Sequence, residues 1–306
     1  MSDKAVIVEN LVVKFGDFKA VNNVSFEVPK GEIFGFLGAN GAGKTTTIRV
    51  ICGLLPPSEG FVLVAGADVA KDPMTVKSRV GYMSQKFTLY RDMSILENLS
   101  FMAHLRRMAE KKIAARIKEL TEFIGLEWPL NTMVKDLPAG VLQQVSLVSS
   151  TIHDPDIVFL DEPTAGVTPH ARQKFWELIK ALAKAGKTVF VTTHYMDEAE
   201  QCGRVALMRS GELIALDSPS KLKEKTFPNP IYEITPSEKP KEGWKQDAIS
   251  QGIADSIETF GMHYHAETRT SEQFENFFQK LPGFAVKKIN PSLEDVFIRI
   301  VEGKNR

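Results

Sequence analysis

A glycine-rich stretch ending in Lys-Thr-Thr has the clearest chemical purpose in this sequence. It consists of Gly38, Ala39, Asn40, Gly41, Ala42, Gly43, Lys44, Thr45 and Thr46. Its spacing fits the phosphate-binding loop G-x-x-x-x-G-K-[ST], whose glycines let successive backbone N–H groups converge on phosphate oxygens. Lys44 offers a positive charge to the β- and γ-phosphates, Thr45 offers a hydroxyl to Mg²⁺, and the following helix start favours an anion. The stretch therefore predicts a nucleoside triphosphate site, because a glycine-rich turn that binds nothing would not need this order.

Acidic and imidazole side chains follow two later strand-like runs. Asp161 and Glu162 come directly after the apolar run 157–160, and His194 follows residues 188–193. Ligands of open parallel sheets bind beyond the carboxyl ends of the strands, so these side chains should converge on the phosphate loop. We expect Asp161 to hold Mg²⁺ directly or through water, Glu162 to orient or deprotonate the attacking water, and His194 to bind the γ-phosphate.

Three residues outside these strands complete the expected site. Gln85 closes the strand-like run 80–84, from which it can contact Mg²⁺ or the attacking water. Phe15 precedes the phosphate loop and can stack on a nucleotide base, a contact worth roughly 1–3 kcal/mol. The alternative for Phe15 is a core residue at a strand end. Val21 lies close to Phe15 in the sequence and is expected at the same part of the nucleotide site.

The hydrophobic pattern supplies a sheet that can position these residues. Apolar or alternating runs, typical of buried and half-buried strands, alternate with helix-like segments. Strands are expected at residues 5–14, 24–28, 33–37, 60–68, 80–84, 157–160 and 188–193, and helices at 46–54 and 169–185. This alternation predicts an α/β fold with a mostly parallel core sheet.

A helical block interrupts the alternation. Ser94 and Glu97 form a capping-box pattern that opens a helix through about Met108, and a second amphipathic helix is expected at residues 111–124. The block continues to about residue 151. We therefore expect an inserted helical subdomain at about 94–151.

The C-terminal part carries a different pattern. Residues 223–230 are charged and then proline-rich, so we expect a linker between a large domain at 1–222 and a small α+β domain at 231–306. In the small domain, strands are expected at 231–235, 262–266 and 285–289, and helices at 244–260, 271–281 and 293–301. His263 and His265 fall on one face of a strand, but no third ligand is apparent, which disfavours a metal site.

Composition excludes several classes of protein. The 306 residues include 38 basic and 38 acidic side chains, so the net charge of zero predicts no nucleic-acid partner and no attraction to an anionic membrane. Cys52 and Cys202 match no metal spacing and no disulfide framework, which fits a reducing cytosol. The N-terminus lacks a signal pattern, and the apolar runs are far shorter than the ~18 residues of a membrane span. We expect a chain that is soluble by itself and that needs a partner to act at a membrane.

In their order along the chain, these motifs resemble those of the ATP-binding cassette (ABC) family over about residues 5 to 222. Phe15 resembles the family's adenine-stacking aromatic, residues 38–45 its Walker A loop, Gln85 its Q-loop, residues 160–164 its Walker B motif, and His194 its switch histidine. The resemblance implies a P-loop NTPase fold with an N-terminal antiparallel β subdomain, and ATP with Mg²⁺ as ligands. It also implies two cassettes that dimerise head to tail, each ATP lying between one Walker A loop and the other signature segment.

Two segments depart from the family's pattern. The usual signature Leu-Ser-Gly-Gly-Gln is replaced by residues 137–141, in which Pro138 and Ala139 stand before Gly140. Each lost hydrogen bond to a charged phosphate costs about 1.5–3 kcal/mol, although N–H groups remain at a helix start. Thr168 stands where the family usually places the aspartate of its D-loop. We therefore expect slow ATP hydrolysis at the sites that this signature and D-loop face.

The tail adds a further resemblance. Residues 290–297, Asn-Pro-Ser-Leu-Glu-Asp-Val-Phe, resemble the ending of bacterial ATPase subunits that pair with exporter permeases of the ABC-2 type, although simple packing of the tail is consistent with the same motif. Residues 81–87 point to the same group. The resemblance implies an ATPase subunit held at the cytoplasmic face of the membrane by a separate ABC-2 permease. Residues 87–92 are a candidate surface for that contact.

Two other functions stay open. Instead of forming a homodimer, the chain can be the low-activity partner in a heterodimer. In that case its degenerate signature makes one nucleotide site mainly structural. It can also be a soluble ABC ATPase that acts on ribosomes or chromosomes. Relatives of that last kind resemble two fused cassettes or carry long coiled coils, whereas this chain has one cassette and no heptad run. The sequence names no transported substrate.

Overall fold

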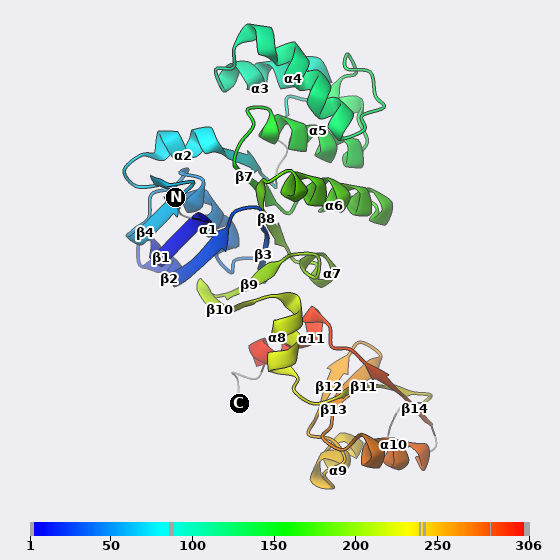
Figure 1. Ribbon diagram of the computed structural model, residues 1–306. Coiled ribbons are helices and arrows are strands. Elements are labelled where there is room, and N and C mark those ends of the chain that lie inside the picture. The colour runs from blue at the N-terminus through cyan, green and yellow to red at the C-terminus, as the bar shows by residue number, and fades with distance from the viewer. Residues whose placement is uncertain (1–2, 86–88, 239, 241–242, 282, 303–306) are drawn as a thin grey trace. The chain divides into compact units, whose positions relative to one another are not determined.

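The computed structural model describes residues 3–85, 89–238, 240, 243–281 and 283–302, and the chain forms two compact units. The first unit ends at Ser218 and the second begins at Pro219. Figure 1 shows both units with most of their elements labelled. None of the helices in the described part of the chain has the length and hydrophobicity that a membrane crossing requires.

A six-stranded sheet forms the centre of the first unit. Its strands are β10 (Glu212–Asp217), β9 (Arg204–Arg209), β3 (Ile33–Leu37), β8 (Thr188–Thr193), β7 (Ile157–Asp161) and β6 (Val80–Met83), in that order across the sheet. Every neighbouring pair is parallel except β10 and β9, which are antiparallel. The prediction of a mostly parallel core sheet is therefore confirmed. Strands β3, β7 and β8 have no exposed side chains, which explains their uninterrupted apolar sequences.

A second sheet in this unit is antiparallel, as the resemblance implied. It has the order β2-β1-β4-β5 and consists of β1 (Lys4–Phe15), β2 (Phe18–Pro29), β4 (Glu59–Val64) and β5 (Ala67–Asp68). The single strand expected at 60–68 is wrong, since Ala65 and Gly66 have φ angles of 48° and 82° and turn the chain back on itself. Helix α2 (Pro73–Arg79), capped by Asp72, was not predicted.

Apart from α2, the helices of the first unit either follow a core strand or belong to the helical block, which Figure 1 shows at the top. Helices α1 (Lys44–Ile51), α6 (Pro169–Lys184) and α7 (Met196–Ala199) follow core strands. Helices α3 (Ile95–Leu105), α4 (Glu110–Phe123) and α5 (Ala139–Thr151), with the short 3-10 helix Val134–Asp136, form the helical block. The predicted capping box is present, because Ser94 Oγ accepts from the N–H of Glu97 and the Glu97 carboxylate accepts from the N–H of Ser94.

The second unit is an α+β module. Its antiparallel sheet has the order β12-β13-β11-β14. The elements are α8 (Pro219–Thr226), β11 (Ile231–Pro236), α9 (Trp244–Ser250), β12 (Ser256–Phe260), β13 (His263–Glu267), α10 (Ser271–Gln279), β14 (Phe284–Ile289) and α11 (Leu293–Glu302). Helices α9 and α10 cover one face of the sheet, and α8 and α11 lie together on the other (Figure 1).

Two expectations for this region differ from the structure. The helix expected at 244–260 ends at Ser250, and Ser256–Phe260 is instead the edge strand β12, in which Ile257 pairs with Ala266. Gly252, with a φ of 69°, ends the helix. Helix α8 begins at Pro219 in the second unit and includes residues 223–226 of the expected linker. The first unit therefore ends at Ser218, four residues before the expected boundary at 222.

The two C-terminal histidines have separate partners. His263 Nδ1 lies 2.9 Å from Thr235 Oγ1, and His265 Nδ1 lies 2.5 Å from the carboxylate of Asp295. Within the described ranges, no group of three or more His, Cys, Asp or Glu side chains is arranged to hold a metal ion.

His153, at the end of the helical block, gives the first unit a predictable response to pH. Burial, and then the charge of Arg106, lower the pKa of His153 to about 4. The unfolded chain, with a histidine pKa of about 6.5, therefore binds a proton between pH 6.5 and 4 that the folded chain excludes. The free energy of unfolding should fall by about 1–2 kcal/mol from pH 7 to 5, allowing for partial screening. Denaturant titrations of wild type and His153→Gln check this: the two slopes against pH should differ in this window, and equal slopes would contradict it.

Candidate active site

The phosphate loop connects β3 to α1 and needs its glycines. Gly38 has a φ of 156°, and a Cβ there would lie 2.3 Å from the carbonyl oxygen of Met208. Gly43 has a φ of 102°, and a Cβ there would lie 2.6 Å from the carbonyl oxygen of Ala20. Helix α1 begins at Lys44, two residues earlier than expected. The first N–H groups of this helix are therefore directed out of its start, where an anion is favoured.

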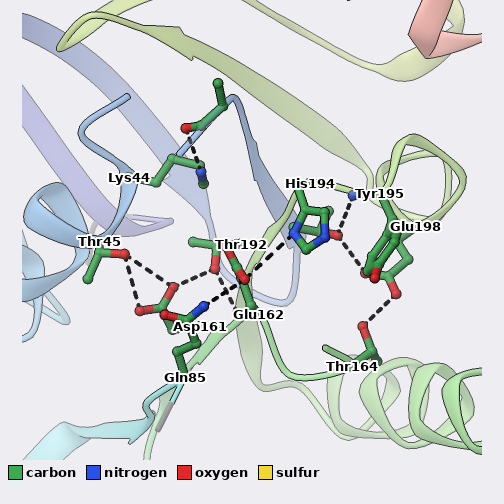
Figure 2. A network of polar contacts seen from close by, with 12 residues as sticks. Lys44, Thr45, Gln85, Asp161, Glu162, Thr164, Thr192, His194, Tyr195 and Glu198 are labelled. Atoms are coloured by element: carbon green, nitrogen blue, oxygen red, sulfur yellow. Dashed lines mark hydrogen bonds and ion pairs between the residues drawn. The ribbon is translucent and has the colours of Figure 1, made fainter. Parts of the chain in front are cut away.

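Lys44 is held inside this loop. Its Nζ donates hydrogen bonds to the carbonyl oxygens of Gly38 at 2.8 Å and Ala39 at 3.1 Å, and the residue is 5% exposed. Burial lowers the pKa of the Lys44 ammonium, while the charges of Glu162 and Asp161 act in the opposite direction. Figure 2 shows Lys44 beside the group formed by Thr45 and Asp161. A phosphate in the loop would give this buried charge an anionic partner.

Asp161 and Thr45 come together where Mg²⁺ is expected. The Thr45 hydroxyl lies 3.3 and 3.5 Å from the two carboxylate oxygens of Asp161, which is 3% exposed. Thr192 Oγ1 donates to the same carboxylate at 2.6 Å, and the Tyr82 hydroxyl donates at 3.3 Å (Figure 2 shows Thr192). Oxygen ligands of one Mg²⁺ lie about 2.1 Å from the ion, so the spacing of Thr45 and Asp161 fits a shared ion.

Thr192 and Tyr82 were not predicted as part of this site. Thr192 is opposite Asp161 in the register of β7 and β8, so the sheet itself brings the hydroxyl to the carboxylate. Burial and the neighbouring Asp161 raise the pKa of Tyr82, which keeps its hydroxyl protonated as a donor. A polar residue near the end of an otherwise apolar strand was the available signal for Thr192.

Glu162 lies between Gln85 and His194. Its backbone is in the left-handed region, with a φ of 49°, and its N–H donates to Thr192 Oγ1 at 2.8 Å. Gln85 Nε2 donates to the Glu162 carboxylate at 2.9 Å, and His194 Nδ1 lies 3.6 Å from the same oxygen (Figure 2). The structure thus places Gln85, Glu162 and His194 in one group, beside the residues of the expected metal site. A water or phosphate oxygen near this carboxylate would meet an acceptor and two donors.

The two residues expected at the nucleotide base behave differently. Phe15 is 53% exposed at the end of β1, so it is not a core residue, and base stacking stays a prediction. Val21 is 0% exposed and packs in the hydrophobic core of the antiparallel sheet. The Val21 side chain therefore offers no exposed surface, and contact of this residue with the nucleotide stays a prediction. Val21 and its neighbour Ala20 are both buried, so the alternation of β2 is interrupted here, before Asn23 with its φ of 52°.

The signature residues and Thr168 lie at two neighbouring helix starts. Pro138 is the N-cap residue of α5 and makes no side-chain cap, and the first helical hydrogen bond joins the N–H of Leu142 to the Pro138 carbonyl. A Cβ on Gly140 would lie 2.9 Å from the Cβ of Ala171 on α6. Thr168 Oγ1 caps α6 by accepting from the N–H of Ala171 at 3.3 Å. The N–H groups of residues 139–141 precede that first helical hydrogen bond, so they have no partner within the helix itself.

Comparisons with known proteins give the family to which the chain belongs. Residues 21–165 match the family model described as ABC transporter. The chain is 42% identical over 229 residues to the probable multidrug ABC transporter ATP-binding protein YbhF of Escherichia coli (strain K12), covering 74% of this chain and 40% of that protein. It therefore spans less than half the length of that relative.

A second relative matches along nearly its whole length. The chain is 34% identical over 301 residues to the Nod factor export ATP-binding protein I of Rhizobium leguminosarum bv. viciae, covering 98% of this chain and 96% of that protein. The solved structure of cbiO1 from Clostridium perfringens, part of the ABC transporter complex cbiONQ, matches with a TM-score of 0.67 and 26% identity, covering 72% of this chain and 91% of that one. With these matches in sequence and fold, the chain belongs to the family of ABC transporter ATP-binding proteins.

Proposed function

We propose that this chain is the ATP-binding and ATP-hydrolysing subunit of an ABC transporter, and that it energises a separate membrane permease. The observation that supports the proposal is the convergence of Lys44, Asp161, Glu162 and His194 beyond the carboxyl ends of β3, β7 and β8. Phosphoryl transfer to water needs a phosphate cradle, an ion site, a water-orienting acceptor and a γ-phosphate donor in one place. These residues provide one of each.

Each side chain has a defined task in this reaction. The Lys44 ammonium now donates to the carbonyl oxygens of Gly38 and Ala39. When ATP binds in the same loop, the ammonium would donate to the β- and γ-phosphate oxygens instead. Thr45 and Asp161 would hold Mg²⁺, which would neutralise phosphate charge. Glu162 accepts a proton or a hydrogen bond from the attacking water, and Gln85 fixes the Glu162 carboxylate. His194 donates to the γ-phosphate from the other side of the same carboxylate.

The proposed partners are a second cassette and a permease. The N–H groups at the start of α5, which have no partner within the helix, and the capped loop at Thr168 suit a head-to-tail dimer in which they would face the partner's ATP. The names of two relatives, which include "multidrug" and "export", support export through a permease, for which the tail sequence suggests the ABC-2 type. The protein would then lie at the cytoplasmic face of the membrane, bound through that permease.

The proposed contact with the permease begins after Gln85. Of the expected surface at 87–92, residues 87 and 88 lie outside the described residues. Tyr90, which precedes the helical block, is 52% exposed and packs edge-on against Phe101 on α3, which is 40% exposed, so the two rings form an aromatic surface. Aromatic side chains are enriched at protein interfaces.

A second candidate is a low-activity cassette within an asymmetric heterodimer. Pro138 lacks the side-chain oxygen and the N–H that a serine would supply at the start of α5, and Thr168 carries no charge. In that arrangement this chain would contribute one weak site, and the partner would contribute the groups for rapid hydrolysis. Mass measurement of the complex isolated from its native membrane separates a dimer of this chain from a mixed pair.

Removal of the metal and of the loop lysine tests the proposal. Phosphate release from ATP by the purified chain should require Mg²⁺ and fall to background when a chelator is added. Lys44→Ala should lower kcat/KM by about 100-fold or more, because several charged hydrogen bonds to phosphate are lost. Lys180→Ala, on the exposed side of α6, is the matched control and should leave the rate unchanged. Equal rates for wild type and Lys44→Ala would contradict the proposal.

A further inference from the structure

Glu198 is a buried carboxylate that the proposed reaction does not use. It lies on the four-residue helix α7 and is 1% exposed. Its Oε1 accepts from Thr164 Oγ1 at 2.5 Å, and its Oε2 accepts from Thr193 Oγ1 at 2.6 Å. Arg172 Nε lies 3.3 Å from Oε1. Burial of a charged carboxylate is unfavourable unless it is paired and hydrogen-bonded, and these three partners meet that need.

The three partners belong to the segments that carry the active site. Thr164 lies two residues after Glu162, in the loop that leaves β7. Thr193 is the last residue of β8 and immediately precedes His194. Arg172 lies on the first turn of α6, whose N-cap is Thr168. Figure 2 shows Glu198 joining Thr164, on one side, to the segment that carries His194 on the other.

The backbone around His194 is fixed on both sides by the same group. Thr193 Oγ1 donates to Glu198 and accepts from the N–H of Tyr195 at 3.0 Å, so this one hydroxyl connects the residues before and after His194. The Tyr195 ring lies 4.1 Å from the His194 ring, and the Arg172 guanidinium lies 4.1 Å from the centre of the Tyr195 ring. His194 is itself 43% exposed in its side chain, so its position depends on these neighbours.

We propose that Glu198 is a positioning residue that holds Glu162 and His194 at their working separation, by tying together the loop after β7, the end of β8 and the start of α6. The proposal rests on the proposed ATPase function. Glu198 contacts neither of the two residues that it positions. Because hydrolysis depends on the placement of the water and the γ-phosphate donor, small displacements lower the rate strongly. The phosphate loop, from which we expect most of the ATP affinity, lies between β3 and α1, and none of its residues is among the Glu198 partners named above.

Substitutions that remove one hydroxyl or one charge test the proposal. Glu198→Gln should lower kcat for ATP hydrolysis about tenfold or more, while the KM for ATP changes less than about twofold. Thr193→Val and Thr164→Val, which keep the side-chain shape, should have the same effect. Thr193→Ser and Thr164→Ser keep the hydroxyl and should restore most of the rate. The double variant Glu198→Gln with Thr193→Val should lose little more than the worse single variant, since both break one network.

A direct measurement of His194 separates this proposal from the proposed function. The imidazole NMR signals of His194, assigned with His194→Gln, should shift in Glu198→Gln, while those of His153 and His263 stay in place. Unchanged His194 signals would overturn the positioning role, whether or not the chain hydrolyses ATP. A kcat per folded molecule within twofold of wild type, accompanied only by a lower melting temperature, would do so as well. Absence of ATP hydrolysis in wild type, with shifted His194 signals, would overturn the proposed function alone.

Discussion

Glu162→Gln should lower kcat for ATP hydrolysis by about 100- to 1,000-fold while the chain still binds ATP. General-base and water-orienting groups typically contribute 10²- to 10⁴-fold, and Gln has the shape of Glu without its basic carboxylate. Gln85 can still donate to the amide oxygen, so the loop should keep its conformation. Lys44 and Thr45 are untouched, so ATP affinity should change less than about threefold. Single-turnover phosphate release and equilibrium binding of ATP measure the two quantities separately.

The same variant should accumulate a dimer. If hydrolysis opens the pair of cassettes, a chain that binds ATP without cleaving it should stay closed, and its mass with ATP and Mg²⁺ should be twice the chain mass of 34.0 kDa. Glu177→Gln, an exposed carboxylate on α6, is the matched control and should leave both rate and mass as in wild type. A rate for Glu162→Gln above about a third of wild type would mean that another group activates the water.

The parts of the site that sequence could predict are those fixed by local chemistry. The glycines of the phosphate loop can be recognised from sequence because the loop needs backbone angles that other residues rarely adopt. Strands β3 and β8 begin and end at the predicted residues because both are short runs buried in the sheet. Parallel strands end at one edge of a sheet, so Asp161, Glu162 and His194 had to converge once these strands were identified. Gln85 followed from the same reasoning at the end of β6.

Other features depend on contacts between distant residues and left no local signal. Glu198 stands in an acidic stretch, and only the fold brings Thr164 and Arg172 to it, 34 and 26 residues away in the sequence. An apolar residue such as Val21 can face either a nucleotide base or the core, so its type alone does not distinguish the two. Its burial in the core follows from the packing of the sheet. The segment 244–260 contains apolar residues at helical spacing, but Ser256–Phe260 is taken up as the partner of β13. Tertiary pairing overrides local periodicity there.

Restoring the family's signature and D-loop should raise turnover. The triple variant Pro138→Ser, Ala139→Gly, Thr168→Asp should increase kcat about tenfold or more. Each regained hydrogen bond to charged phosphate is worth about 1.5–3 kcal/mol. Only an interaction that is stronger in the transition state than in bound ATP raises kcat, so the expected gain is smaller than the full sum. The structure accommodates all three changes. At position 138, serine is a favoured N-cap residue for α5. At position 168, an aspartate carboxylate can accept the hydrogen bond that the N–H of Ala171 now donates to the Thr168 hydroxyl.

Matched variants separate the effect of adding a negative charge at position 168 from the effect of the helix cap that Thr168 provides. Thr168→Asn keeps a side-chain oxygen for the α6 cap but adds no charge, so it should leave kcat near the wild-type value, whereas Thr168→Asp should raise it. Gly140→Ala should lower the rate even in the restored background, because its Cβ would lie 2.9 Å from that of Ala171 and push α5 from α6. If steady-state ATPase assays show that the triple variant dimerises with ATP but turns over no faster, then Pro138, Ala139 and Thr168 do not limit hydrolysis. The slow step would then lie in the missing permease or partner cassette.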